Sequence, residues 1–216
     1  KLGRILIASD AAHSFGATYK GKRSGSLADV SCFSFHAVKN LTTAEGGAVC
    51  FNLPDDFNHE EIYQDFVTIT LHGQSKDALA KTKKGSWKYD VLVPGYKCNM
   101  TDIQAAMGLV ELDRYQENLD RRKAIFSAYD KAFSEQSWTI LPPHVSNEKM
   151  SSHHLYLLRI KDITEEQRDA IIQAIFEKEV SVNVHFQPLP LLTAYNNLGY
   201  RIDNYPIAYQ KYQNEI

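Results

Sequence analysis

Two residues whose side chains could take part in chemistry, one with a carboxylate and one with an amine, each follow an apolar run in the first 40 residues. Asp10 ends the run 5–9, and Lys39 stands just past the run 26–35, before a loop of Thr, Glu and Gly. In open α/β sheets, ligands bind at the carboxyl ends of the strands. A lysine amine can form a Schiff base with an aldehyde cofactor, and a carboxylate can hold a pyridine nitrogen protonated. Either residue alone has a common structural explanation, as a turn aspartate or a solvated lysine. Together they are the smallest set of side chains that the chemistry of pyridoxal phosphate (PLP) requires.

The elements that must position these two residues are short β-type runs. Residues 5–9, 26–35 and 46–52 are apolar runs separated by polar or Gly-containing turns, which predicts strands of a buried sheet. Residues 55–95 are polar and mixed, and we interpret them as a long excursion outside the core. Over residues 100–133, apolar side chains recur at helical spacing after Thr101 as N-cap, which predicts a long helix with one break.

The last third of the sequence predicts a smaller α+β unit. Residues 142–152 have the composition of a linker. The runs 153–160 and 180–186 predict strands, and the segment 164–179 between them predicts a capped helix. The fold class is therefore α/β, with a large first part and a small second part.

Composition excludes several function classes. The chain has 216 residues, is 44% hydrophobic and carries a formal net charge of −2, with Lys and Arg scattered, so neither a nucleic-acid partner nor a membrane partner is expected. No apolar stretch approaches the roughly 20 residues that spanning a bilayer requires. The cysteines Cys32, Cys50 and Cys98 lack metal-ligand spacing and fit a reducing compartment. We expect a cytoplasmic protein without a metal site.

Several motifs in order then point to a family. The segment 8–52, ASDAAHSFGATYKGKRSGSLADVSCFSFHAVKNLTTAEGGAVCFN, resembles the DegT/DnrJ/EryC1/StrS family of PLP-dependent nucleotide-sugar aminotransferases. The match continues through LHGQSKDA, PGYKCNMTDIQAAMGLVELDRY and HFQPLP, so it covers nearly the whole chain. Ser9 stands where the family pattern has Glu. The resemblance implies the PLP-transferase fold type I, with a mostly parallel central sheet, a small C-terminal α+β domain and a homodimer with shared active sites.

The same resemblance implies that the chain is a fragment. Residues 1–141 would be part of the large PLP-binding domain with its long connecting helix, and residues 142–216 part of the small C-terminal domain. The N-terminal part of the large domain, which includes a phosphate-binding helix terminus, would be missing. Helix N-termini are natural phosphate sites, so the 216 residues alone are expected to be poorly active.

The resemblance assigns roles to residues near the first strands. Lys39 would be the Schiff-base lysine and Asp10 the partner of the pyridinium nitrogen, which makes them the catalytic pair. His13 would lie beside the cofactor ring, and Ser34 would place its hydroxyl on the cofactor phosphate. The structural alternatives are a buried histidine bonded to backbone for His13 and a strand serine facing a turn for Ser34.

Three further residues are assigned to the partner's cofactor and to the substrate. In the block GYKCNMTDIQAAMG, Lys97 takes the place of an Asn, and Asn99 that of an Arg, in the commoner family version. One of the two would reach the cofactor phosphate of the partner subunit. His185 would approach the sugar nucleotide, with a polar residue at a strand end as the alternative.

The implied function is PLP-dependent transamination. Glutamate would supply the amino group, and the keto group of a nucleotide-linked hexose, at the 4-position, would receive it, in the biosynthesis of cell-surface polysaccharide or amino sugars. One alternative is the dehydratase branch, in which histidine replaces the lysine found here as Lys39. The other is a cofactor-free structural or regulatory derivative, which could have lost Asp10, Ser34 or Lys39. All three are present, which favours transamination.

Overall fold

The computed structural model describes residues 2–75 and 88–216, which form two compact units. Unit 1 comprises Lys1–Leu119 and Asn147–His154, and unit 2 comprises Asp120–Ser146 and Leu155–Ile216. The two units thus alternate along the chain. The expected division into domains 1–141 and 142–216 stays a prediction about the complete fold.

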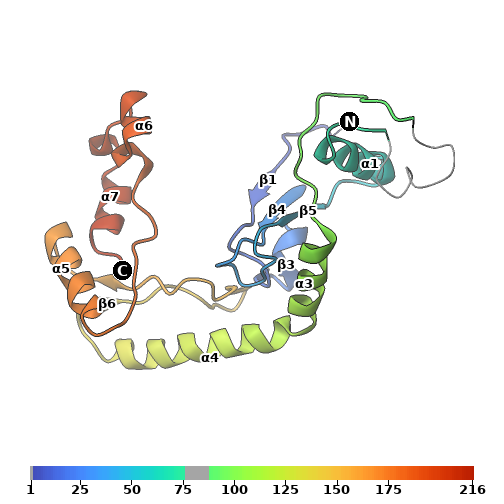
Figure 1. Cartoon of the computed structure of the whole chain (residues 1–216). Coiled ribbons are helices and arrows are strands. Elements are labelled where there is room, and N and C mark those ends of the chain that lie inside the picture. The colour runs from blue at the N-terminus through green and yellow to red at the C-terminus, as the bar shows by residue number, and fades with distance from the viewer. Residues whose placement is uncertain (1, 76–87) are drawn as a thin grey trace. The chain divides into compact units, whose positions relative to one another are not determined.

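A mixed sheet forms the centre of unit 1. Its strands are β1 (Ala8–Asp10), β4 (Val30–Ser34) and β5 (Gly47–Phe51), in the order β1-β4-β5 (Figure 1). The β1–β4 pair is parallel, with Asp10 opposite Cys32, and the β4–β5 pair is antiparallel, with Ser34 opposite Gly47. The carboxyl ends of β1 and β4 therefore lie at the same edge of the sheet.

The first strand is shorter than its apolar run predicts. Only Ala8–Asp10 pairs with β4, and the side chains of Ile5, Leu6 and Ile7 are 87%, 50% and 59% exposed. Before Ala8, the sheet is joined to this segment by one backbone bond, from the Val30 N–H to the Ile7 carbonyl at 3.2 Å, and by a buried carboxylate. Asp29 accepts two hydrogen bonds from the Arg4 guanidinium, at 2.7 and 2.6 Å, and one from the Ile7 N–H at 2.8 Å.

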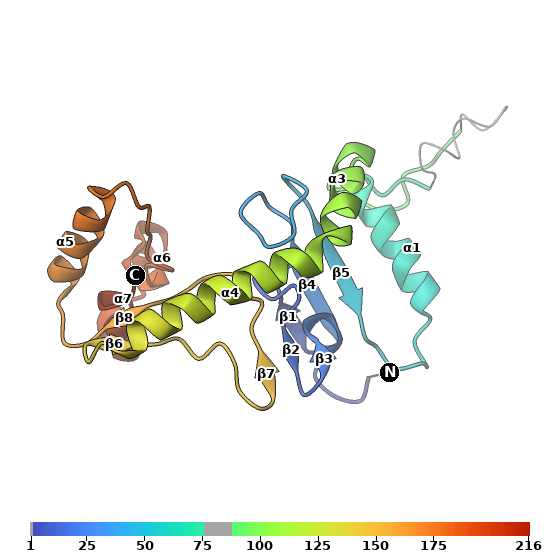
Figure 2. The same ribbon diagram turned by 90° about the horizontal axis from the view of Figure 1, so that it is seen from below.

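A second small sheet brings a distant segment into unit 1. Its strands are β2 (Thr18–Tyr19), β3 (Lys22–Arg23) and β7 (Lys149–Met150), in the order β3-β2-β7 (Figure 2). A 3₁₀ turn at Ser24–Ser26 follows β3. Because β7 pairs with β2, residues 147–154 lie beside the turn that follows β1, although they are far from it in sequence.

The region 55–95, predicted to be an excursion outside the core, contains a helix. This helix, α1, spans His59–Thr70, and the side chain of its N-cap Asn58 accepts a hydrogen bond from the Glu61 N–H at 3.1 Å. The sequence signal was the run N-H-E-E, a cap residue followed by two acids in the first turn. Residues 76–87 of the excursion lie outside the described residues.

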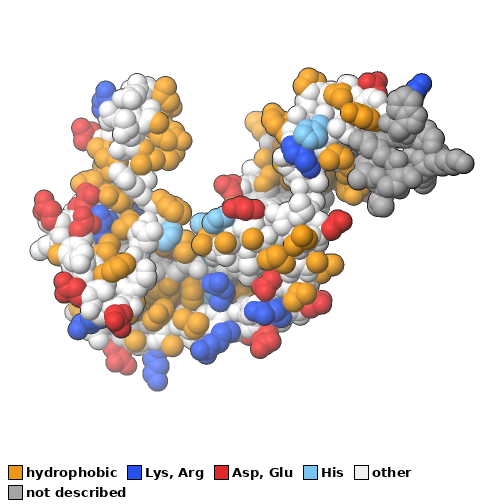
Figure 3. All heavy atoms as spheres, viewed as in Figure 1, with side chains coloured by type: hydrophobic (Ala, Val, Ile, Leu, Met, Phe, Trp, Pro, Cys, Tyr) orange, Lys and Arg blue, Asp and Glu red, His pale blue; other side chains and the backbone are white. Residues whose placement is uncertain are grey.

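The long helix predicted within residues 100–133 is present and is broken once, as expected. It consists of α3 (Asp102–Asp113) and α4 (Tyr115–Ser134), with Arg114 between them. Thr101 caps α3 in a reciprocal capping box with Gln104. Ile103, Leu109 and Val110 on α3 are 77%, 66% and 62% exposed, and Figure 3 shows hydrophobic side chains gathered over this helix.

The core of unit 1 lies where the start of α4 meets the loop after β4. Its buried members are Phe35, Leu41, Tyr115 and Leu119. Phe15, Phe33 and Met100 pack against them. The loop that carries Lys39 is therefore anchored in the core through Leu41, two residues further along.

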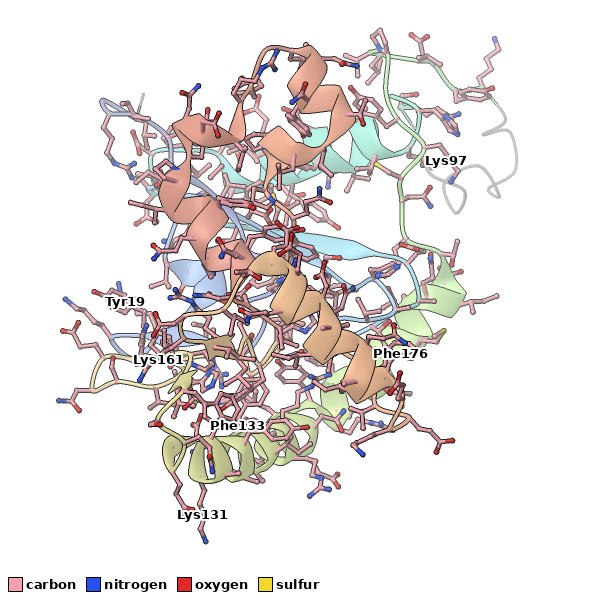
Figure 4. The ribbon with its side chains drawn as sticks, turned by 90° about the vertical axis from the view of Figure 1, so that its left-hand side faces the viewer. Tyr19, Lys97, Lys131, Phe133, Lys161 and Phe176 are labelled. Atoms are coloured by element: carbon pink, nitrogen blue, oxygen red, sulfur yellow. The ribbon has the colours of Figure 1, made fainter. Side chains whose placement is uncertain are left out.

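Unit 2 contains short elements around helix α5. They are β6 (Thr139–Ile140), β8 (Arg159–Ile160), α5 (Glu165–Phe176), α6 (Thr193–Asn197) and α7 (Pro206–Gln213), with 3₁₀ turns at Leu189–Leu191 and Ile202–Asn204. Thr164 caps α5 in a capping box with Gln167, which confirms the predicted capped helix. Figure 4 labels Phe133 on α4 and Phe176 at the end of α5.

The two strands predicted in unit 2 are largely absent. Of the run 153–160, only Arg159–Ile160 pairs, with β6, and the described residues include no strand in 180–186. An alternating pattern predicts a face to bury, whereas a strand also needs a hydrogen-bonded neighbour. Val182, Asn183 and His185 instead line an apolar groove of about 460 Å³ beside α4 and α5.

Within the described part of the chain, no helix is both long and apolar enough to cross a bilayer.

Candidate active site

Asp10 occupies the carboxyl end of β1, with its side chain exposed. Its Oδ1 accepts a hydrogen bond from the Ala12 N–H at 3.1 Å, which fixes the carboxylate over the turn that follows. The Ala11 N–H donates to the Cys32 carbonyl at 2.9 Å and extends the parallel ladder one residue past the strand. A carboxylate has further acceptor sites, so one bond leaves Asp10 able to bind a cation or an N–H group.

Ser34 lies on the same sheet face as Asp10. Partners in a parallel ladder point to the same face, and so do residues two apart on one strand. Because Asp10 is paired with Cys32, Ser34 stands on that face about 7 Å further along. The half-buried Ser34 hydroxyl accepts the His36 N–H at 3.4 Å.

Lys39 is carried by a loop whose two ends are bonded to each other. The Phe35 N–H donates to the Gly46 carbonyl at 2.8 Å, and the Thr43 N–H donates to the Phe35 carbonyl at 2.9 Å. Inside the loop, the Lys39 N–H donates to the His36 carbonyl at 2.9 Å. The Lys39 side chain is half-buried and makes no hydrogen bond or ion pair with the residues that the structure describes.

The turn that closes this loop needs its two glycines for close approach. A Cβ on Gly46, whose φ is +159°, would collide with the hydroxyl of Thr43, and a Cβ on Gly47 would collide with the Phe33 carbonyl. The Glu45 carbonyl accepts a hydrogen bond from Gln104 Nε2 at 2.8 Å, which joins the turn to the first turn of α3. The two glycines thus have a structural role, which is to let the chain turn tightly back into β5.

His13 lies in the turn after β1 and is exposed, so the alternative of a buried histidine is wrong. Its ring meets the ring of His154 edge to face, with centroids 4.4 Å apart. Its carbonyl accepts a hydrogen bond from the Ser152 hydroxyl at 2.5 Å. His13, Asp10, Ser34 and the Lys39 loop all belong to the carboxyl edge of the β1–β4 pair.

Lys97 and Asn99 are exposed on the extended segment that leads into α3, where Figure 4 shows Lys97. Lys97 Nζ donates a hydrogen bond to Asn99 Oδ1, so the two candidates for one role form a pair. No hydrogen bond joins either of them to Asp10, Ser34 or Lys39 within residues 2–75 and 88–216.

His185 is the predicted site residue that lies in unit 2. It is half-buried, lines the apolar groove there, and its ring contacts Phe186 with centroids 4.6 Å apart.

Sequence reasoning missed Asn40, which directly follows Lys39. Its Nδ2 donates to the Ser152 carbonyl at 2.6 Å, and its Oδ1 lies 2.9 Å from Nδ1 of His154. The partners are 112 and 114 residues away in sequence, beyond the reach of local patterns. The available signal was an Asn next to the candidate Schiff-base lysine, in a loop that has to be held in place.

Comparison with known proteins places this geometry in a family. The model of the DegT/DnrJ/EryC1/StrS aminotransferase family matches residues 3–216. The spore coat polysaccharide biosynthesis protein SpsC of Bacillus subtilis is 35% identical over 219 residues, 98% of this chain and 54% of SpsC. The UDP-4-amino-4,6-dideoxy-N-acetyl-beta-L-altrosamine transaminase of Campylobacter jejuni is 33% identical over 194 residues, 90% of this chain and 48% of that enzyme.

Solved structures agree. The sugar aminotransferase candidate Spr1654 of Streptococcus pneumoniae, in its PMP form, superposes with a TM-score of 0.92 and 51% identity over 98% of this chain and 53% of that one. Helicobacter pylori PseC superposes with a TM-score of 0.82 and 26% identity over 98% of this chain and 53% of that one. The present chain spans about half the length of the curated relatives that it matches. The expected fold, part of the PLP-transferase fold type I, is thereby confirmed, and the chain belongs to the DegT/DnrJ/EryC1/StrS aminotransferase family.

Proposed function

We propose that the protein carrying this chain is a PLP-dependent aminotransferase that acts on a keto sugar linked to a nucleotide. The observation that carries this proposal is the placement of Asp10, Ser34 and the loop that carries Lys39 at one edge of the sheet. Relatives support it. Spr1654 has been solved in PLP and PMP forms, and the Campylobacter jejuni relative is named a transaminase of a UDP-linked amino sugar.

The donor set at this edge fits PLP. The exposed Asp10 carboxylate suits a protonated ring nitrogen, the Ser34 hydroxyl suits a phosphate oxygen, and the Lys39 amine suits an aldehyde. When bound, PLP supplies the aldehyde carbon that carries the amino group and a ring that accepts electrons from the substrate.

Each residue would then have one task in the proposed reaction. Asp10, as an anion, would favour a proton on the ring nitrogen. Ser34 would donate its hydroxyl hydrogen to a phosphate oxygen and so help to hold the phosphate. Lys39 Nζ, when neutral, would accept a proton from the substrate carbon. His13, at the same edge, would lie by the ring.

We further propose glutamate as the amino donor and the 4-keto position of the hexose as the acceptor, in cell-surface polysaccharide or amino-sugar biosynthesis. The name of SpsC, a spore coat polysaccharide biosynthesis protein, supports this role. We propose a cytoplasmic homodimer in which the Lys97–Asn99 pair reaches the cofactor phosphate of the partner subunit and His185 approaches the sugar nucleotide. The exposed position of the pair supports that assignment.

The experiment uses the protein with all of the sequence that its gene encodes. PLP should produce a visible absorbance band, and borohydride should fix the cofactor to Lys39 in a peptide map. With glutamate and a panel of keto sugar nucleotides, we expect an amino sugar. Loss of a hydroxyl from the sugar would favour the dehydratase alternative. Absence of both the band and the product would favour the cofactor-free derivative.

The isolated 216-residue chain should be compared in the same assay. We expect it to turn over poorly, because a phosphate site at a helix N-terminus is proposed to lie elsewhere in the protein. Equal activity of the chain and of the longer protein would contradict that expectation.

A further inference from the structure

The residue that follows Lys39 is held at both ends of its amide. Asn40 Nδ2 donates to the Ser152 carbonyl at 2.6 Å, and Asn40 Oδ1 lies 2.9 Å from His154 Nδ1. Because Nδ2 is the donor end, Oδ1 has to accept, and therefore His154 carries a proton on Nδ1. The next residue, Leu41, is 4% exposed in the core of unit 1. Lys39 is thus followed directly by Asn40, which hydrogen bonds hold in place, and by Leu41, which packs in the core.

The partners of Asn40 belong to a short segment, residues 151–154, which we name the strap. The strap follows β7, and its Ser152 is 4% exposed and His153 2% exposed. His153 has a φ of +52°, in the left-handed region that a side chain rarely adopts. A buried residue in that conformation indicates that the surrounding contacts hold the strap in place.

The strap also bonds to the turn after β1. The Ser152 hydroxyl donates to the His13 carbonyl at 2.5 Å, and the ring of His154 contacts the ring of His13. Two strap residues therefore bond or contact two different loops, one that begins next to Asp10 and one that carries Lys39. All of these residues lie in unit 1.

We propose that Asn40 is a positioning residue, which acts through the strap to set the place of the Lys39 amine relative to the turn after Asp10. The inference rests on the proposed function, in which Lys39 and Asp10 act on one cofactor. Lys39 and Asp10 are on different loops, so their separation depends on what joins those loops. A misplacement of about 1 Å can cost on the order of a hundredfold in rate.

The first test needs no cofactor. In the full-length protein, hydrogen exchange of residues 36–43 and 151–154 is compared between wild type, Asn40→Ala and the matched control Asn52→Ala. Asn52 Nδ2 also donates to a backbone carbonyl, that of Ser26 at 3.2 Å, but on the loop after β5. We expect Asn40→Ala to speed exchange in both segments by roughly tenfold, the effect of losing hydrogen bonds of ordinary strength, and Asn52→Ala to leave both unchanged.

The second test uses the PLP-loaded protein. Asn40→Ala should lower the single-turnover rate with glutamate by roughly 10- to 100-fold and shift the pH midpoint of the visible band, while the KM for glutamate stays near wild type. A residue that only stabilised the fold would not move the band. Combining Asn40→Ala with His154→Ala should cost less than the sum of the single effects, because both variants remove the same bond.

A variant that preserves shape keeps the proposal testable if the alanine variant does not fold. Asn40→Asp retains the acceptor for His154 and removes the donor to Ser152, so it should also speed exchange. Wild-type exchange in both Asn40 variants would overturn the inference, and so would faster exchange with an unchanged rate and band. If the wild-type protein forms no visible band, the proposed function fails, and the exchange comparison still decides whether the strap holds the Lys39 loop.

Discussion

Gln104 bonds at once to its own helix and to the turn that closes the Lys39 loop. Its Oε1 accepts the Thr101 N–H at 2.9 Å in the capping box of α3, and its Nε2 donates to the Glu45 carbonyl at 2.8 Å. Gln167 has the same capping-box position on α5, where its Oε1 accepts the Thr164 N–H at 2.9 Å. Gln104 and Gln167 are therefore a matched pair of capping residues. Gln104 also donates a hydrogen bond to a distant residue, whereas Gln167 Nε2 donates none among the described residues.

This pair gives a stability prediction. Gln104→Glu keeps the capping acceptor but places a carboxylate against the Glu45 carbonyl, so we expect it to lower the free energy of unfolding by about 1–2 kcal/mol. Gln167→Glu should be neutral or slightly stabilising, because it adds an anion at a helix N-terminus. Urea unfolding of both variants checks the prediction, and equal effects would show that the bond to Glu45 contributes nothing.

The proposed role of Lys39 predicts a large loss of activity on substitution. Lys39→Ala removes both the attachment point for the cofactor aldehyde and the proton carrier, so amino transfer should fall by at least about a thousandfold. The control Lys22→Ala changes an exposed lysine on β3 and should retain wild-type turnover. Product formation and borohydride labelling, measured together, check the prediction. Labelling at another lysine would refute the assignment.

Asp29 should make the stability of unit 1 depend on acid. Hydrogen bonds from Arg4 and from the Ile7 N–H lower the pKa of Asp29 from 3.8 to about 2. A depressed pKa in the folded state stabilises the fold above 3.8, and that contribution is lost as the pH falls through about 2. We expect Asp29→Asn to lower the melting temperature at neutral pH.

The difference between Asp29→Asn and wild type should shrink as the pH is lowered. Asp55→Asn, on an exposed loop, serves as the control and should have little effect at any pH. A deficit for Asp29→Asn that stays constant from neutral pH to pH 2 would contradict the assignment.

His144 should have the corresponding effect nearer to neutral pH, in unit 2. Burial lowers its pKa from 6.5, and the nearby Asp130, 3.6 Å from its Nε2, opposes that shift. The folded state therefore binds this proton less well than the unfolded state. The stability contributed by neutral His144 is present above pH 6.5 and falls as the pH drops below it.

Substitution of the ring tests this assignment. His144→Phe removes the titrating group and keeps an aromatic ring against Phe126, whose centroid lies 4.6 Å away. The slope of unfolding free energy between pH 7 and pH 5 should become flatter in this variant. His59→Phe, at an exposed site, should keep the wild-type slope. An unchanged slope in His144→Phe would assign the pH dependence to another group.

The strand ends of the site were predictable from sequence, because local patterns determine them. Asp10 directly follows one apolar run and Ser34 is the next-to-last residue of another, and a parallel register brings such ends to one edge. The caps at Thr101 and Thr164 were predictable for the same reason, since each is followed three residues later by Gln. Lys39 was assigned its role from a family motif; its loop directly follows β4, and the role itself stays a prediction.

The remainder depends on contacts between distant residues. The run 180–186 has a strand pattern, but among the described residues it pairs with no other strand, so it is not a strand. Ile5 to Ile7 have the composition of a buried strand and are exposed, and the hydrogen bond between Arg4 and Asp29 in that segment joins residues 25 apart in sequence. The bond between Asn40 and His154 spans 114 residues, and a single sequence gives no sign of such a pairing.

That long span also has a consequence for synthesis on the ribosome. Asn40 leaves the exit tunnel well before Ser152, whose carbonyl accepts the hydrogen bond from the Asn40 amide, because 112 positions separate the two residues. Until Ser152 emerges, the bond from Asn40 cannot fix the position of the Lys39 amine. Contacts between residues so far apart in sequence form late in folding. Cofactor capture should therefore be among the last steps of maturation, and nascent chains halted before residue 152 should remain colourless.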